Sequence, residues 1–110
     1  MKNIITFTAI ALSILSFDAN SGLTDESCAR LSKRTETAYS ALGSNPHMTI
    51  QRRLDFIADM ALGIESQDRL KKSEPELMRF WRNTVELAIQ VQMKPELLET
   101  TIRQGCEAIP

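Results

Sequence analysis

Apolar residues recur at steps of three and four along most of this chain, which is the spacing of one face of an α-helix. The pattern forms four stretches separated by breaks. The first follows Thr24, a residue suited to cap a helix, and stops at Gly43. The second follows Asn45 and Pro46, which are typical of an N-cap and a first helical residue, and reaches Ile64. These stretches predict two helices.

The second half of the chain predicts two more helices. Ser73 and Glu76 match a capping box, in which the serine caps the helix and the acidic side chain reaches back to the cap. The apolar face that follows continues to Gln92. Pro95 then begins a last helix, which extends to Cys106.

The third predicted helix has the widest apolar arc in the chain, so we expect it to be the most buried. Its apolar face includes Trp81, Leu87 and Val91. The stretch 65–72 before it has Leu70 as its only large apolar residue and is interpreted as a connector, with a single helical turn capped by Ser66 as the alternative. From the helical faces we expect one shared core, formed by Leu31, Leu54, Ile57, Leu77, Trp81, Ala88 and Ile102.

The first 21 residues have the layout of a secretory signal peptide. A basic start is followed by an uncharged apolar run, Ile4 to Phe17, and then by small residues at Ala19 and Ser21. The run is shorter than the about 20 residues that span a bilayer. We therefore expect export to the periplasm or the extracellular space, with residues 22–110 left as a single helical domain. An uncleaved anchor is the alternative. No later stretch predicts stable membrane insertion.

The two cysteines, Cys28 and Cys106, lie near opposite ends of the predicted domain. In an exported chain, such a pair predicts a disulfide. Four helices joined by short connections pack antiparallel in sequence, so the last helix ends where the first begins. Three helices would leave the cysteines about 20–25 Å apart. The sequence therefore predicts an all-α, antiparallel four-helix bundle closed by one disulfide. Pairing of each cysteine with another molecule is the alternative.

Charge and composition exclude several classes of partner and fold. The chain has 13 basic and 14 acidic residues, which are interspersed, and a net charge of −1. Nucleic-acid binding calls for a strongly basic face, so we expect no nucleic-acid partner. Aromatic residues make up 5% of the chain and no β-branched alternation is present, which argues against a β-sandwich.

No group of residues in the sequence completes an active site or a metal site. His47 is the sole histidine, whereas zinc sites need three or four protein ligands. Asp55 and Asp59 share a helical face, and paired carboxylates can perform acid–base chemistry. Arg52, one turn earlier, instead fits a solvated row of alternating charge. We therefore predict a non-enzymatic protein with no cofactor and no metal.

Arginines beside aromatic residues give the candidate for protein binding. Arg79 and Arg82 flank Phe80 and Trp81 in the third predicted helix. This composition is common in binding hot spots. Trp81 also lies on the apolar face of its helix, which favours a core position over an interface position.

In size and single disulfide the chain resembles the periplasmic acid-activated chaperones. Its cysteines enclose a wider span than in that family, and no motif carries individual residues across. Our leading hypothesis is an exported, non-enzymatic factor that binds another protein, as inhibitors, immunity proteins and secretion accessory factors do. The alternative is a stress or acid-protective chaperone of the periplasm, in which protonated carboxylates leave the basic residues to repel one another.

Overall fold

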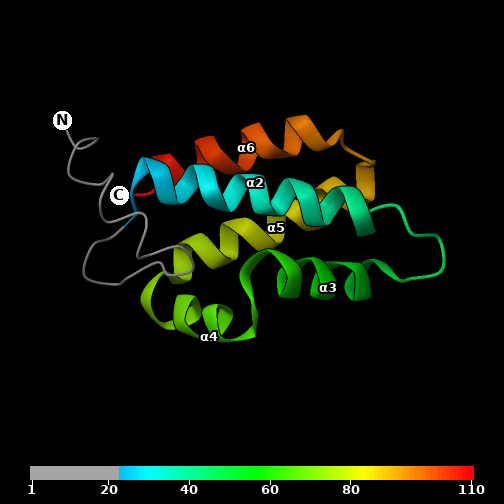
Figure 1. The fold of residues 1–110 in the computed structure, drawn as a ribbon, viewed down its shortest axis with the longest axis horizontal. Coiled ribbons are helices and arrows are strands. Elements are labelled where there is room, and N and C mark those ends of the chain that lie inside the picture. Colours follow the sequence, from blue (N-terminus) through cyan, green and yellow to red (C-terminus); the bar gives the residue numbers. More distant parts are fainter. Residues whose placement is uncertain (1–22) are drawn as a thin grey trace.

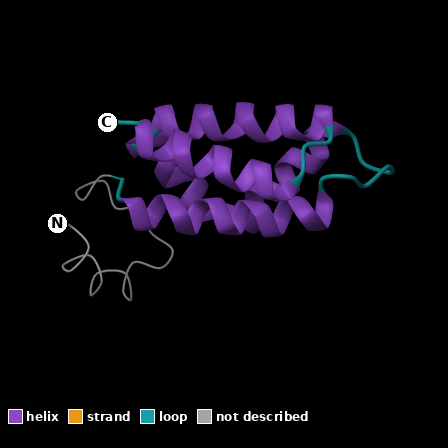
Figure 2. Ribbon diagram, turned by 90° about the horizontal axis from the view of Figure 1, so that it is seen from above, coloured by secondary structure: helices purple, strands orange, loops and turns teal. Residues whose placement is uncertain are grey.

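The computed structural model describes residues 23–110, and every regular element in that part of the chain is an α-helix (Figure 2). The helices are α2 (Asp25–Leu42), α3 (Ile50–Leu62), α4 (Ile64–Ser73), α5 (Pro75–Val91) and α6 (Pro95–Ala108). The all-α prediction is therefore confirmed. The predicted signal peptide and its cleavage site lie outside the described residues.

The long helices alternate in direction along the bundle (Figure 1). The chain runs one way in α2, returns in α3, runs forward in α5 and returns in α6, so the start of α2 and the end of α6 lie at the same end. Helix α2 packs on α3 and α6, and α5 packs on the same two helices from the opposite side. Helix α4 contacts α3 and α5.

The stretch 65–72, predicted to be a connector, is instead helix α4, so the described chain contains five helices and not four. Gly63 separates α3 from α4 with φ 82° and ψ 153°, a conformation that favours glycine. Lys71 and Lys72 lie in the last turn of α4, where positive charge suits the helix dipole. The prediction was wrong because buried Leu70 is enough to fasten a short helix that is polar elsewhere.

The predicted start of the second helix at Asn45 and Pro46 was also wrong. Helix α3 begins after Thr49, whose hydroxyl accepts a hydrogen bond from the backbone N–H of Arg52 at 3.1 Å. The Asn45 side chain accepts a hydrogen bond from the backbone N–H of His47 at 2.9 Å. An asparagine bonded to the backbone two residues on stabilises a turn, so the Asn-Pro pair forms the loop before the helix.

The predicted capping box does not form. Ser73 is the last residue of α4, and its hydroxyl donates to the backbone carbonyl of Arg69 at 3.0 Å. Glu74 occupies the N-cap position of α5 without a side-chain cap bond, and Pro75 is the first helical residue. Proline suits this position because its φ is already helical and its missing N–H is not needed there.

Other predicted helix ends are confirmed. The Thr24 hydroxyl caps α2, α5 ends at left-handed Gln92, and Pro95 begins α6. Gly43 follows α2 as predicted, but its φ of −63° is right-handed. The Tyr39 ring explains the glycine, because a Cβ at Gly43 would lie 2.8 Å from it.

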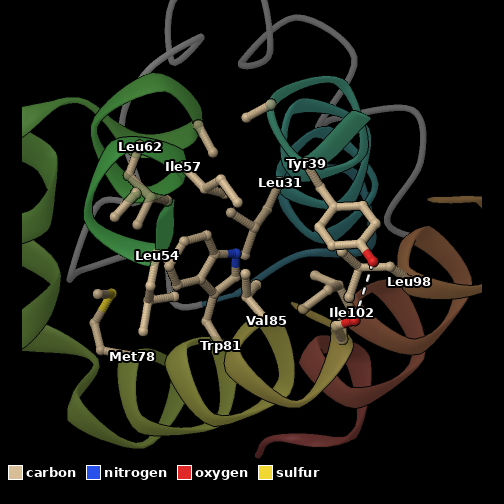
Figure 3. Close-up of a cluster of buried hydrophobic side chains, with 14 of the residues drawn as sticks. Leu31, Tyr39, Leu54, Ile57, Leu62, Met78, Trp81, Val85, Leu98 and Ile102 are labelled. Atoms are coloured by element: carbon tan, nitrogen blue, oxygen red, sulfur yellow. Dashed lines mark hydrogen bonds between the residues drawn. The ribbon is translucent and has the colours of Figure 1, made fainter. Parts of the chain in front are cut away.

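A single core surrounds Trp81, whose side chain is fully buried (Figure 3). Its indole lies between Leu54 of α3 and Leu31 of α2. The indole N–H donates to the Thr35 hydroxyl at 2.8 Å, and that hydroxyl donates to the backbone carbonyl of Leu31 at 2.7 Å. The polar edge of the ring is therefore satisfied inside the core. The core prediction is confirmed, since all its members are buried: Leu31, Leu54, Ile57, Leu77, Trp81, Ala88 and Ile102.

The predicted disulfide joins Cys28 in the first turn of α2 to Cys106 in the last turn of α6. Their Cα atoms are 5.6 Å apart, within the range that a disulfide requires. Both side chains are buried. The bridge therefore fixes the first and last described helices to each other at one end of the bundle.

Candidate protein-binding surfaces

Six large apolar side chains remain exposed among residues 23–110, and we name them in two sets according to the helices that carry them. We call the first the α3 surface; it consists of Arg52, Phe56, Met60 and Ile64. We call the second the α5–α6 surface; it consists of Leu87, Val91 and Leu97. Exposed apolar residues that gather on one face mark contact sites, whereas isolated ones need no explanation.

The α3 surface lies on the side of α3 that the core does not use. Phe56 and Met60 are one turn apart, and their side chains are 43% and 51% exposed. The guanidinium of Arg52, one turn earlier, lies over the Phe56 ring at 6.0 Å from its centroid, a cation–π contact. Ile64, the first residue of α4 after the break at Gly63, is 69% exposed. Arginine, phenylalanine and methionine are the residue types that protein interfaces favour.

The arginines predicted for protein binding, Arg79 and Arg82, lie on α5. The guanidinium of Arg82 is 3.4 Å from the Asp55 carboxylate of α3, and both side chains are partly exposed. This ion pair links α5 to the helix that carries the α3 surface. Arg79 is exposed and forms no ion pair with any other residue of 23–110. Trp81 is buried, as predicted, so the aromatic ring at this surface is Phe56, which sequence reasoning missed.

The sequence analysis did not predict the α5–α6 surface, because it expected the wide apolar arc of α5 to be buried. Leu87 and Val91 are 50% and 58% exposed, although the pattern placed them on the most buried helix. The core uses the neighbouring face of α5, where Val85, Ala88 and Ile89 are buried. The wide arc therefore contains two faces, one inside the core and one at the surface.

The exposed face of α5 belongs to a row with steps of four, three and four residues, formed by Phe80, Thr84, Leu87 and Val91. This spacing is typical of a seam between two helices. The first part of the row is covered, because the Phe80 ring packs so closely on Gly105 of α6 that a Cβ there would overlap it. The second part, Leu87 and Val91, is open. Leu97 of α6, beyond the turn that joins the two helices, is 56% exposed.

A polar contact also links α2 to α6. The buried Ser32 hydroxyl donates to a Glu99 carboxylate oxygen at 2.8 Å, and the guanidinium of Arg103 lies 3.3 Å from the same oxygen. The hydrogen bond from Ser32, together with Arg103, holds the pKa of Glu99 below its usual value despite partial burial. This tie and the disulfide hold the same two helices together.

Surface hollows among residues 23–110 are lined by groups already engaged in the fold, as two examples show. The first, about 230 Å³, is lined by Tyr39, whose hydroxyl donates to the Met93 backbone carbonyl at 2.6 Å. The second, about 410 Å³, contains Arg34 and Asp59. Arg34 donates to a backbone carbonyl of α3 at 2.9 Å, and Asp59 accepts from the Gln67 side-chain amide at 2.9 Å. These polar groups fasten helix ends to one another.

The residues considered for catalysis form no shared site in the structure, because the two aspartates have separate partners. Asp55 pairs with Arg82, Asp59 bonds to Gln67, and His47 is exposed in a turn. Within residues 23–110, no three side chains of the types His, Cys, Asp and Glu are grouped to hold a metal ion. No helix in that same range combines the length and apolar character needed to cross a membrane.

Comparisons with known proteins give no relative for this chain: no protein family, no curated protein and no solved structure matches it. The resemblance to acid-activated chaperones therefore stays one of size and disulfide number. The two apolar surfaces and the disulfide are the features on which a function can be built.

Proposed function

We infer that this protein is an exported, non-enzymatic factor that binds another protein through its α3 surface, as an inhibitor, an immunity protein or a secretion accessory factor does. The observation that carries the inference is the arrangement of Arg52, Phe56 and Met60 in one exposed row. An aromatic anchor braced by an arginine is the composition of a binding hot spot. No described helix covers this row.

The charges of the α3 surface define the chemistry of the partner. The Arg52 guanidinium lies over the Phe56 ring, and a guanidinium presents five N–H donors, which a cation–π contact leaves available for hydrogen bonds. These donors match a carboxylate in bidentate geometry. Exposed Arg79 adds a second cation on neighbouring α5. The partner that fits presents an apolar side chain flanked by acidic residues.

Export is part of this proposal. The buried disulfide between Cys28 and Cys106 is compatible with an oxidising compartment, and the first 21 residues have the layout of a signal peptide. Intact-mass analysis of protein recovered from the cell envelope and the medium tests it. We expect a mature chain that begins near Gly22. A mass that includes Met1 to Phe17 would instead mean that the apolar run is retained.

The binding proposal is tested with the oxidised protein and two surface variants. The wild type, immobilised in envelope extract, is expected to retain one protein in stoichiometric amount, and calorimetry with that purified protein then gives the affinity. Met60→Lys should weaken binding by about tenfold or more, because it places a charge in the apolar contact. Leu87→Lys, an equally exposed change on α5, is the matched control and should leave the affinity unchanged.

A second variant tests the charge of the partner. Arg52→Glu should abolish binding to an acidic partner and remove most of the salt dependence of association, because it reverses the sign of the contact. Absence of any stoichiometric partner under all growth conditions contradicts the proposal. So does a partner whose affinity falls with Leu87→Lys but not with Met60→Lys.

An acid-protective chaperone is the alternative, and the contact between Ser32 and Glu99 is the observation that favours it. Protonation of Glu99 weakens the polar tie between α2 and α6, while the disulfide keeps the two helices attached. The acidified chain can then expose apolar core without unravelling. Addition of the purified protein to an aggregating client at acid pH should reduce light scattering. Unchanged scattering removes this alternative.

A further inference from the structure

We propose that helix α4 opens as a unit while α2, α3, α5 and α6 stay packed, and that its basic side chains then form a cleavage site. The protease that fits this site cuts after Lys or Arg. Hydrolysis there gives two chains, which the disulfide keeps joined. The inference concerns a modification site and does not depend on partner binding by the α3 surface.

Helix α4 is fastened to the bundle by one large apolar side chain. Of its ten residues, only Leu70 and Ser66 are buried, and the helix contacts α3 and α5. The Gln67 side-chain amide donates to the Asp59 carboxylate of α3 at 2.9 Å, but this bond is exposed and competes with water. A segment with few buried apolar contacts and exposed polar bonds opens at a lower free energy than the core does.

The helical path of the chain is interrupted at both ends of α4. Gly63, with φ 82° and ψ 153°, separates α4 from α3, and Glu74, with φ −136° and ψ 64°, separates it from α5. Gly63 also occupies the N-cap position, so no side chain caps the start of α4. Because of these two breaks, α4 can unfold without loss of the hydrogen bonds inside α3 or α5.

The residues that a Lys- or Arg-specific protease recognises are concentrated on α4. Arg69, Lys71 and Lys72 are exposed and lie within four positions of one another. The longest connection between described helices, 43–49, contains no basic residue except His47, and Lys94 in the last connection is followed by a proline. Proteases cut locally opened chain, so basic residues inside the helices that stay packed are protected.

The disulfide keeps the cleaved domain together. A cut after Lys72 adds one water across the peptide bond and leaves a carboxylate on Lys72 and an amine on Ser73. The new ends lie between Cys28 and Cys106, so the bridge joins the two chains. Helices α2 and α3 belong to the first chain and α5 and α6 to the second, and α2 packs on α6 as α3 packs on α5. The two-chain product therefore retains the bundle.

Limited digestion of the oxidised protein with trypsin tests the proposal. We expect the first cut after Arg69, Lys71 or Lys72, assigned by the masses of the fragments. The product should remain one band on a non-reducing gel and become two fragments after reduction. At low trypsin concentration the rate of cleavage reports the population of the open state. A first cut in any other helix overturns the proposal.

Three variants distinguish opening of α4 from unfolding of the whole domain. Leu70→Ala should raise the rate of cleavage in α4 about thirtyfold or more, because it weakens only the closed state. Gly63→Ala should raise it about fivefold or more. A Cβ at Gly63 meets no atom within 4 Å, so this change acts through the unfavourable positive φ, which opening relieves.

Ile102→Val, a change in the buried core of α6, is the control. It should lower the urea midpoint of global unfolding and leave the cleavage rate in α4 unchanged, because it weakens contacts that stay formed when α4 opens.

Circular dichroism establishes that each variant is folded, and Leu70→Val, with a smaller increase in rate, replaces Leu70→Ala if the alanine variant unfolds. Faster cleavage of α4 in Ile102→Val would mean that α4 opens only with the whole domain, which overturns the proposal. Unchanged cleavage rates in the Leu70 and Gly63 variants overturn it as well.

Discussion

Replacement of Trp81 by alanine tests the central feature of the fold. Its side chain is fully buried and contacts helices on both sides of the core. Truncation of a buried tryptophan costs about 3–5 kcal/mol in lost transfer free energy and cavity formation. The Thr35 hydroxyl loses the indole N–H but still donates to its backbone acceptor, so little is added to that loss. Because small domains have about 5–15 kcal/mol of stability in total, Trp81→Ala should lose a large share of the free energy of unfolding and melt well below the wild type.

Urea unfolding followed by far-ultraviolet circular dichroism is the appropriate assay, because the variant removes the only tryptophan and with it the fluorescence signal. Trp81→Phe is the comparison: it keeps an aromatic ring and loses the hydrogen bond to Thr35, for an expected loss of about 1–2 kcal/mol. The reasoning is refuted if Trp81→Ala keeps the wild-type midpoint. Loss of partner binding at unchanged stability would place Trp81 in an interface instead of the core.

The remaining predictions concern three other contacts. The disulfide closes a loop of sequence separation 78, so a double Cys28→Ala, Cys106→Ala variant should lose about 2–5 kcal/mol, seen as a lower melting temperature than that of the oxidised wild type; equal temperatures contradict this. The pKa of Glu99 is lowered in the folded protein. Its carboxylate therefore adds fully to the free energy of unfolding above the unfolded pKa of 4.5, and this stabilisation is lost as pH falls through the lower pKa of the folded state. Glu99→Gln should therefore melt below the wild type at neutral pH, with a difference that shrinks on acidification; a constant difference refutes it. Gly105→Ala should destabilise the wild type, because the new Cβ overlaps the Phe80 ring. In a Phe80→Val background the same substitution should stabilise the protein by about 1 kcal/mol, because alanine has the higher helix propensity. A change in melting temperature of the same sign in both backgrounds contradicts the overlap.

The apolar pattern predicted the core because spacing alone identifies which residues of a helix share a face. Leu54 and Ile102 are far apart in sequence, yet both were assigned to the core from the periodicity of their own helices. The cysteine positions supplied the long-range information that periodicity lacks, since they required the last helix to return to the start of the first. For these reasons the helical class and the disulfide could be predicted.

Helix boundaries were predicted less well where two local signals competed. At Ser73 the serine suited a cap, but Pro75 fixed the start of α5 and left Ser73 to complete α4. At Asn45 the side chain could cap a helix or close a turn, and it closed the turn. The break at Gly63 is a single residue with positive φ, and the sequence alone does not distinguish it from a tolerated glycine inside one longer helix.

The candidate surfaces depended on information that a single helix does not contain. A wide apolar arc can be wholly buried or divided between core and surface, and the choice depends on how many helices surround it. Helix α5 contacts α3 and α6 through its other face, so Leu87 and Val91 lie outside the core and are exposed to solvent. Arg79 and Arg82 could be proposed from their neighbours in sequence, whereas the cation–π contact of Arg52 with Phe56 required the α3 backbone to bring the two side chains together.

The position of the disulfide determines how the domain responds to tension. A force that pulls on its two ends enters near Leu23 and leaves near Ile109, and it passes from Cys28 to Cys106 through the covalent bridge. The residues between them, 29–105, form a closed loop that the force bypasses. Among the described residues, only the short segments before Cys28 and after Cys106 can be extended by the force. The α3 surface lies within that loop and therefore stays undeformed while the chain ends are pulled, and the folded domain transmits force as a short, inextensible link.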